Sequence, residues 1–161
     1  MRYAVKIMFK EDLNPDILQL VNEEVEILAM LDHPNVVKYM ESYTDDHNIY
    51  IVMEYLEDAE ELQKMIEKQK TIMDADDSKT YQSLFPAEQV CRIMLMIMTG
   101  LHHIHTNNVV HRDFKAENCL VDKNLQLRII DFGLSKMVQH EEGGQLLLGT
   151  PYYMAPEVYE M

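Results

Sequence analysis

Two short stretches, His111-Arg112-Asp113-Phe114-Lys115-Ala116-Glu117-Asn118 and Asp131-Phe132-Gly133, are the most informative parts of this chain. The first follows a long apolar segment, and the second ends a short strand-like run. Working outward, Lys6 stands on a strand-like segment, and Glu24 follows it 18 residues later. Ala155-Pro156-Glu157 begins 24 residues after Asp131. Five separated elements therefore occur in one order along the chain.

Length, charge and cysteine content limit the class of protein. The chain has 161 residues, enough for one domain with a hydrophobic core, and its 28 acidic and 14 basic side chains give a net charge of −14. Binding a phosphate backbone needs a cationic surface, so no nucleic-acid partner is expected. Cys91 and Cys119 form neither a disulfide framework nor a four-ligand zinc pattern. Both are expected to be small core residues of an intracellular protein.

No segment resembles a signal peptide or a membrane span. The first residues carry charges at Arg2 and Lys6, and the longest apolar run, Ile93–Met98, is far shorter than a membrane-spanning helix. We therefore expect a soluble, cytoplasmic protein with no membrane partner.

The first third of the chain alternates strand and helix signals. Tyr3–Phe9 is strand-like, and Asn14-Pro15 starts a helix. The apolar residues of this helix recur at three- and four-residue steps as far as Asp32-His33-Pro34. Two further strand-like runs, Val36–Tyr43 and Ile49–Tyr55, follow.

The middle of the chain is predominantly helical. Glu60–Lys70 is expected to be a short helix and Thr71–Phe85 a surface insertion, and a long helix follows from Pro86 toward His105. The centre of the long helix, Ile93–Met98, is apolar on every face, so we expect it to lie inside the domain. Short strands are expected afterwards at Cys119–Val121 and Leu125–Ile130.

The ordered series of motifs resembles the signature of eukaryotic protein kinases. That signature has a strand lysine, a helix glutamate, His-Arg-Asp with a later Asn, Asp-Phe-Gly and Ala-Pro-Glu. The resemblance covers nearly the whole chain, from Tyr3 to Met161. It implies an incomplete, two-lobed α+β fold. The small, mostly β lobe would span residues 1–53 and include one helix, the hinge 54–60, and the larger, mostly α lobe 61–161, with the catalytic loop and activation segment.

Two segments are similar to the calcium/calmodulin-regulated and calcium-dependent branch of the serine/threonine kinases. They are Leu31-Asp32-His33-Pro34-Asn35 and the stretch from Gly149 to Glu157. Phe114 and Ala116 replace the usual Leu and Pro of the catalytic loop, and both replacements are apolar. The sequence contains no calcium-binding loop motif, so calcium control would need a region outside this chain.

The resemblance implies a role for each residue that carries it. Lys6 would hold the α- and β-phosphates of ATP, and Glu24 would fix Lys6 through an ion pair, with Glu23 as the second choice. Asp131 would bind the Mg²⁺ that bridges the phosphates. Asp113 would accept or orient the proton of the substrate hydroxyl. Two further residues complete the expected site: Lys115, which would contact the γ-phosphate and marks serine/threonine specificity, and Asn118, which would bind a second metal ion.

By the same resemblance, Met53-Glu54-Tyr55-Leu56 is the hinge whose backbone would meet the adenine. Met53 would guard the back of the pocket, and Ala4 and Leu120 would sandwich the ring. Glu60 or Glu61 would reach the ribose or a basic residue of the substrate.

Regulation and substrate choice can also be predicted. Arg112 belongs to the type that often pairs with an activation-loop phosphate, and we hypothesise that Glu141 or Glu142 supplies this negative charge constitutively. A solvated charge pair on a loop is an equal alternative. Glu117 often accompanies a preference for protein or peptide substrates with basic residues near the target hydroxyl, and the net charge of −14 favours such substrates weakly.

Part of the kinase pattern is missing from the chain. The family places two strands and a glycine-rich loop before the lysine strand, and the five glycines present cannot form that loop. We expect a fragment of a larger kinase that alone binds ATP poorly, with the apolar helix from Val90 to Leu101 left partly uncovered. A non-catalytic pseudokinase or scaffold is the main alternative. An acidic peptide-binding module would explain the charge but not the motifs.

Single residues also have simpler interpretations. Lys6 on its own would be an ordinary strand-edge lysine. The cluster of His102, His103 and His105 suggests a metal site, but packing is favoured because no matching Cys or carboxylate set accompanies it. His111 is likewise expected to be a buried packing residue.

Overall fold

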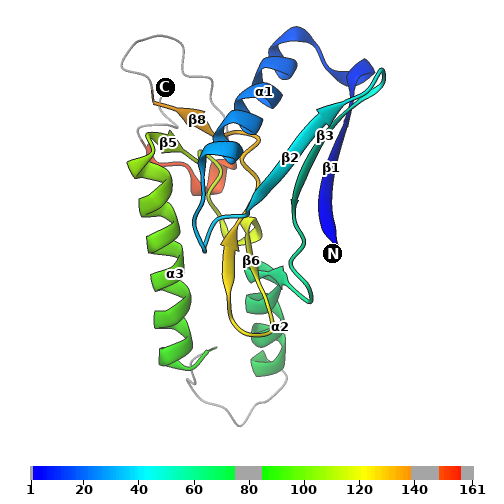
Figure 1. Ribbon diagram of the computed structural model, residues 1–161. Coiled ribbons are helices and arrows are strands. Elements are labelled where there is room, and N and C mark those ends of the chain that lie inside the picture. The colour runs from blue at the N-terminus through cyan, green and yellow to red at the C-terminus, as the bar shows by residue number, and fades with distance from the viewer. Residues whose placement is uncertain (1, 75–84, 139–148, 157–161) are drawn as a thin grey trace.

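The structure is a computed structural model that describes residues 2–74, 85–138 and 149–156. Helices and small β-sheets are both present, so the expected α+β class is confirmed (Figure 1). Most of the expected surface insertion, Glu141 and Glu142, and Glu157 lie outside the described residues. The lobe boundaries expected at residues 53/54 and 60/61 stay a prediction.

A three-stranded antiparallel sheet forms the N-terminal part of the structure, with the strand order β1-β3-β2 (Figure 1). The strands are β1 at Tyr3–Phe9, β2 at Tyr39–Thr44 and β3 at Asn48–Glu54. The bounds of β1 are the expected ones. Because side chains at alternate positions of a strand share a face, Ala4 and Lys6 lie on the same side of the sheet.

Helix α1, Pro15–Met30, lies beside this sheet and follows a short 3-10 helix at Lys10–Asp12 (Figure 1). It begins where the sequence predicts, because Asn14 Oδ1 accepts a hydrogen bond from the Ile17 N–H at 2.9 Å and caps the helix. Glu24, Ile27 and Leu28 are buried on one face of the helix, as three- and four-residue spacing requires. A carboxylate is thereby carried into the interior.

The C-terminal part contains two helices and short strands. Helix α2 spans Leu62–Asp74, and the long helix α3 spans Ala87–Thr106. A second sheet has the order β4-β6-β7, and β5 pairs with β8 (Figure 1). The remaining short elements are β4 (Glu60–Glu61), β5 (Val109–Val110), β6 (Cys119–Val121), β7 (Leu127–Ile129), β8 (Lys136–Met137) and the 3-10 helices Ala116–Asn118 and Pro151–Tyr153.

The long helix is buried on one face only, so the expectation that its apolar centre lies wholly inside the domain is wrong. Ile93 and Ile97 are buried, whereas Met94, Leu95 and Met98 are 49%, 65% and 59% exposed. An apolar face of α3 is therefore uncovered among the described residues, which agrees with the expectation of partly uncovered helix faces. Cys91, which is on the same helix, is exposed and not a core residue, whereas Cys119 is fully buried.

Two other expected elements differ from the structure. The strand expected at Val36–Tyr43 begins only at Tyr39, because Val36 pairs as an isolated parallel bridge with Ile129 of β7. The helix expected from Glu60 begins at Leu62, because Glu60 and Glu61 pair with β6. In both cases a partner distant in sequence overrides the local preference. Among the described residues, no helix has the length and apolar character needed to cross a membrane.

Candidate active site

A cavity of about 870 Å³ lies between the N-terminal sheet and the short strands of the C-terminal part. Lys115 and Asn118 of the expected catalytic set line it, whereas Asp113 does not. The carboxylate of Asp113 contacts both of these lining residues. Every residue expected to bind nucleotide also lines the cavity: Ala4, Lys6, Glu24, Met53, Glu54, Leu56, Leu120 and Asp131.

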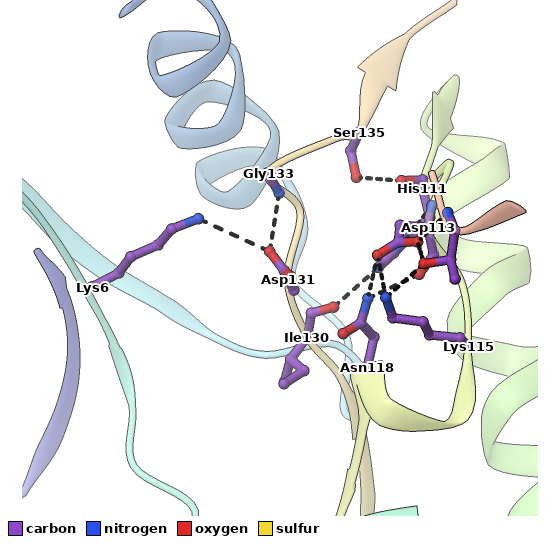
Figure 2. Close-up of polar contacts among 10 residues, drawn as sticks. Lys6, His111, Asp113, Lys115, Asn118, Ile130, Asp131, Gly133 and Ser135 are labelled. Carbon is purple, nitrogen blue, oxygen red and sulfur yellow. Dashed lines mark hydrogen bonds and ion pairs between the residues drawn. The ribbon is translucent and has the colours of Figure 1, made fainter. Parts of the chain in front are cut away.

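One wall of the cavity carries an ion pair between strand β1 and helix α1. Lys6 Nζ lies 2.7 and 2.8 Å from the two carboxylate oxygens of Glu24, and the ion pair expected from the sequence is present. Glu23, the second choice, instead accepts a hydrogen bond from Gln19. Lys6 Nζ also lies 3.9 Å from Asp131 Oδ1, and a dashed line marks this contact in Figure 2. A single ammonium group thus links the sheet, the helix and the Asp-Phe-Gly segment.

Gly133 lies directly against this charged cluster. A Cβ atom at this position would stand 3.3 Å from Lys6 Nζ, 3.4 Å from Asp131 Oδ1 and 3.5 Å from Glu24 Oε2. Asp131 itself has a φ of 62°, a left-handed backbone conformation that turns its carboxylate toward Lys6 (Figure 2). A side chain at position 133 would therefore contact three of the charged groups.

A second cluster surrounds the carboxylate of Asp113 (Figure 2). Oδ2 contacts Lys115 Nζ at 2.9 Å and accepts from Asn118 Nδ2 at 3.2 Å. Oδ1 accepts from the Thr150 hydroxyl at 2.6 Å and from the Thr150 N–H at 2.9 Å. Lys115 Nζ in turn donates to the Thr150 hydroxyl oxygen at 2.7 Å. The carboxylate is held by four donors and has one orientation.

These contacts set the charge state of the cluster. Burial alone would raise the pKa of Asp113, but the hydrogen bonds from Thr150 and Lys115 outweigh it and hold the pKa below its usual value. The hydrogen bond to Asp113 raises the pKa of Lys115 above its usual value. At neutral pH both groups are therefore charged.

His111 holds the catalytic loop to the strand that precedes Asp131. Its Nε2 lies 3.0 Å from the Ile130 carbonyl oxygen, and its ring packs against Phe132 at 5.0 Å between centroids. Ser135 Oγ donates to the His111 carbonyl oxygen at 3.2 Å (Figure 2). Burial lowers the pKa of the imidazole, so it remains neutral. The expected packing role of His111 is confirmed.

Thr150 is the residue of the site that sequence reasoning missed. It reaches Asp113 because the preceding Gly149 has a φ of 119° and lies against the Arg112 carbonyl oxygen, where a side chain would not fit. The only sequence signal was its place after a glycine and before Pro151. The sequence also indicated no role for the side chain of Glu54. Its carboxylate accepts hydrogen bonds from the Lys38 N–H and from Arg128 Nε.

The side-chain oxygens of Asn118 and Asp131 suit a hard cation, provided that a bound ligand supplies further oxygens. Asn118 turns its amide nitrogen to Asp113, which leaves its oxygen Oδ1 for a cation, and Asp131 offers carboxylate oxygens on the same cavity. Among the described residues, no group of three or more His, Cys, Asp and Glu side chains is arranged to bind a metal on its own. Asp131 and Asn118 therefore fit Mg²⁺ only together with further oxygens, such as those of a phosphate group. Of the three clustered histidines, His102, His103 and His105, His103 packs against His33, and the two ring centroids are 5.0 Å apart.

Comparison with known proteins identifies many kinases that are similar to this chain. It is 33% identical over 160 residues to myosin light chain kinase A of Dictyostelium discoideum, a match that covers 98% of this chain and 50% of that protein. It is 31% identical over 157 residues to a probable serine/threonine-protein kinase, MARK-A, of the same organism, covering 98% of this chain and 14% of that protein. Calcium-dependent protein kinase 6 of Plasmodium berghei is 36% identical over 143 residues, covering 87% of this chain and 9% of that protein.

The chain spans half or less of the length of these relatives. The protein kinase domain family matches residues 1–160, which is almost the entire chain. The family match covers almost the whole chain, and the charged clusters around one cavity agree with it: this chain belongs to the protein kinase family.

Proposed function

We propose that this chain carries the catalytic centre of a serine/threonine protein kinase, which transfers the γ-phosphate of ATP to a protein hydroxyl. One observation carries the proposal: the Lys6–Glu24 pair, Asp131, Lys115 and Asn118 all line one cavity. Phosphoryl transfer depends mainly on positioning and on neutralising the charge of phosphate oxygens. Cationic and cation-binding side chains on one cavity supply both.

The cavity can receive ATP in one orientation. The apolar side chains of Ala4, Met53 and Leu120 line the part near the hinge, where the backbone of Glu54 and Leu56 would bond to the adenine. Lys6 lies toward Asp131, where the phosphates would reach. Because Glu24 holds Lys6 with both carboxylate oxygens, the ammonium group is already oriented before a phosphate binds.

Asp131 and Asn118 would hold Mg²⁺ against the phosphates. When bound, this ion would neutralise charge on the β- and γ-phosphate oxygens. The Lys6 ammonium group contributes a second positive charge near the same place, and Lys115 a third on the side of Asp113.

Asp113 would orient the substrate hydroxyl and accept its proton at Oδ1 or Oδ2. Its lowered pKa makes it a weak base, so it would accept the proton late, when the hydroxyl oxygen has already begun to bond to phosphorus. Lys115, which contacts both Asp113 and Thr150, is the side chain that would meet the γ-phosphate. The pattern of Asp113 followed by Lys115 supports serine or threonine as the acceptor.

Basic residues near the target hydroxyl are proposed as part of the substrate. Glu117 Oε2 is buried and has no hydrogen-bond partner among the described residues, and Glu117 lines the cavity. Glu60 and Glu61 also lie near this end, but each pairs with a lysine of α2. An unpaired buried carboxylate oxygen is costly unless a ligand satisfies it, and a substrate arginine or lysine would do so.

The activity is tested in a longer protein that contains this chain, by transfer of labelled γ-phosphate from Mg²⁺–ATP to a peptide library. We expect Asp113→Asn and Lys6→Met to abolish transfer, whereas Lys70→Met, on the exposed side of α2, leaves it unchanged. Nucleotide-dependent thermal stabilisation without any transfer would instead favour a pseudokinase. If the longer protein shows no transfer and no nucleotide binding, the proposal is overturned.

The preference for basic substrates has a separate test. Glu117→Gln is expected to lower kcat/KM for arginine-containing peptides by about tenfold or more, since a hydrogen bond between charged groups contributes about 1.5–3 kcal/mol. The same variant should leave alanine-substituted peptides unaffected, and Glu88→Gln, at an exposed position of α3, is the matched control. An equal loss for both peptide sets would contradict direct recognition by Glu117.

Calcium control and location in the cell extend beyond this chain. We propose cytoplasmic localisation, which cell fractionation tests. A calcium-binding region outside this chain stays a prediction, supported by the calcium-dependent relative. Removal of calcium from a longer protein that contains the chain is the experiment that tests it.

A further inference from the structure

The side chain of Glu54, which lines the cavity, joins three segments of the chain. Its Oε1 accepts a hydrogen bond from the Lys38 N–H at 2.8 Å and another from Arg128 Nε at 3.1 Å. The backbone N–H of Glu54 donates back to the Lys38 carbonyl oxygen at 2.9 Å. Glu54 ends β3 and begins the hinge, and Arg128 is the central residue of β7.

The same three segments are held together by backbone hydrogen bonds. The Val37 N–H donates to the Ile129 carbonyl oxygen, and the Ile129 N–H donates to the Asn35 carbonyl oxygen, each at 2.9 Å. We call residues 35–38, Glu54 and Arg128 the junction. Residues 35–38 follow α1, which carries Glu24, and Arg128 stands three residues before Asp131. The junction thus connects the hinge with the segments that lead along the chain to Glu24 and to Asp131.

The Glu54–Arg128 pair differs in burial from the other ion pairs of the hinge. Its two side chains are only 24% and 21% exposed. In the pair between Asp58 and Lys123, by contrast, the side chains are 63% and 66% exposed. Exposed pairs contribute little, because solvent screens them and long side chains lose entropy. A partly buried pair whose oxygen also holds a backbone N–H fixes geometry more strongly.

We propose that Glu54 and Arg128 are positioning residues that fix the hinge relative to the strand leading to Asp131. The proposal rests on the proposed function, because the ligand it concerns is ATP. A nucleotide held at the hinge and at Asp131 needs a constant spacing between the two. If the hinge is loose, binding has to order it, and that cost lowers affinity. Glu54 therefore acts through its side chain on β7, in addition to offering its backbone to adenine.

The first measurement needs no nucleotide. In amide hydrogen exchange of the free chain, Arg128→Met should speed exchange of the Lys38 and Glu54 amides about tenfold through easier local opening. Amides in the interior of α3 should keep their rates. Lys123→Met removes a cation from the same hinge and should change none of these rates. Unchanged exchange at Lys38 and Glu54 in Arg128→Met would overturn the proposal.

The second measurement is the affinity for Mg²⁺–ATP, with KM and kcat measured wherever transfer occurs. Arg128→Met and Glu54→Gln should each weaken binding about tenfold and raise KM with kcat kept, as expected for loss of binding alone. Arg128→Lys, which keeps the charge, should recover part of the loss. The double variant should lose no more than either single variant, because the two residues act as one contact.

The outcomes separate the junction from the function. Additive losses, or equal losses in Lys123→Met, would overturn the positioning role. Faster exchange at the junction in a chain that binds no nucleotide would support the junction as a structural tie and overturn its proposed part in ATP binding together with the proposed function. If Arg128→Met does not fold, Glu54→Gln and Arg128→Lys carry both measurements.

Discussion

At the scale of single residues, the site depends on side chains with more than one partner. Asp113 accepts hydrogen bonds at both carboxylate oxygens, and Lys6 contacts two carboxylates. Such groups keep one orientation, because moving them would break several contacts at once. A substitution that removes one of these contacts should therefore change the pKa of the group that loses its partner, while the remaining contacts keep the fold.

Thr150→Val is the substitution that isolates this effect. It removes the hydroxyl that donates to Asp113 Oδ1 and accepts from Lys115, while the Thr150 N–H can still donate. Because the hydroxyl hydrogen bond lowers the pKa of Asp113, its loss should raise that pKa. A carboxylate titration by NMR measures this, and Thr150→Ser is the control that keeps the hydroxyl. An unchanged pKa in Thr150→Val would contradict the assignment.

At the scale of elements, strand β1 and the start of α1 follow from local signals. The strand-like run Tyr3–Phe9 and the Asn14-Pro15 helix start are local features of the sequence, and both were predicted at the observed positions. Strand β2 and the start of α2 were misplaced, because Val36 and Glu60 pair with residues 93 and 61 positions away, that is 129 − 36 and 121 − 60. Contacts over such separations leave no periodic trace in the sequence.

Gly100 gives an element-scale prediction about how α3 packs. A glycine-to-alanine change inside a helix normally stabilises by about 1 kcal/mol. Here a Cβ would stand 2.8 Å from Ile129 Cδ1 and 3.1 Å from the Asn35 carbonyl oxygen. Gly100→Ala should therefore destabilise the chain by about 1–3 kcal/mol, as overpacking does. Chemical denaturation measures the change.

The control for this prediction is on the same helix. Met98→Ala, at a side chain that is largely exposed, should change stability by no more than about 0.5 kcal/mol. A Gly100→Ala variant more stable than the parent would show that α3 can move away from β7 at little cost.

At the scale of the whole molecule, protonation of His33 and His111 should weaken the packing of the N-terminal and C-terminal parts of the structure. Burial lowers the pKa of both His33 and His111; for His33 the nearby charges of His103 and Arg128 lower it further. His33 Nδ1 accepts a hydrogen bond from the Asn35 N–H, and His111 Nε2 bonds to the Ile130 carbonyl oxygen. The first contact is local and the second spans 19 residues, but His33 also stacks on His103 of α3, with the ring centroids 5.0 Å apart.

The sign of the pH dependence follows from these lowered pKa values. In the unfolded chain both imidazoles take up protons as pH falls below about 6.5, whereas in the folded chain they resist protonation. Their contribution to stability is therefore complete above pH 6.5 and is lost as pH falls through the lowered folded-state values. We expect the midpoint of thermal unfolding to be constant above about pH 7 and to decrease below about pH 6.5.

Calorimetry at several pH values checks this, with two variants for comparison. His33→Asn keeps an acceptor for the Asn35 N–H but cannot be protonated, so its midpoint should decrease less steeply. His105→Gln, at an exposed position, should follow the parent chain. Identical slopes in all three proteins would contradict a role for His33.

The sequence by itself determined the family, the α+β class and the charged residues of the two clusters, because phosphoryl transfer requires particular residue types in a particular order. It favoured Glu24 over Glu23 as the partner of Lys6, and the structure decided for Glu24. Only the tertiary structure revealed that Thr150 holds Asp113 and that Glu54 bonds to Arg128, 74 residues away in the chain. The physical reason is that a hydrogen bond depends on distances of about 3 Å, which the folded backbone sets and no local pattern records.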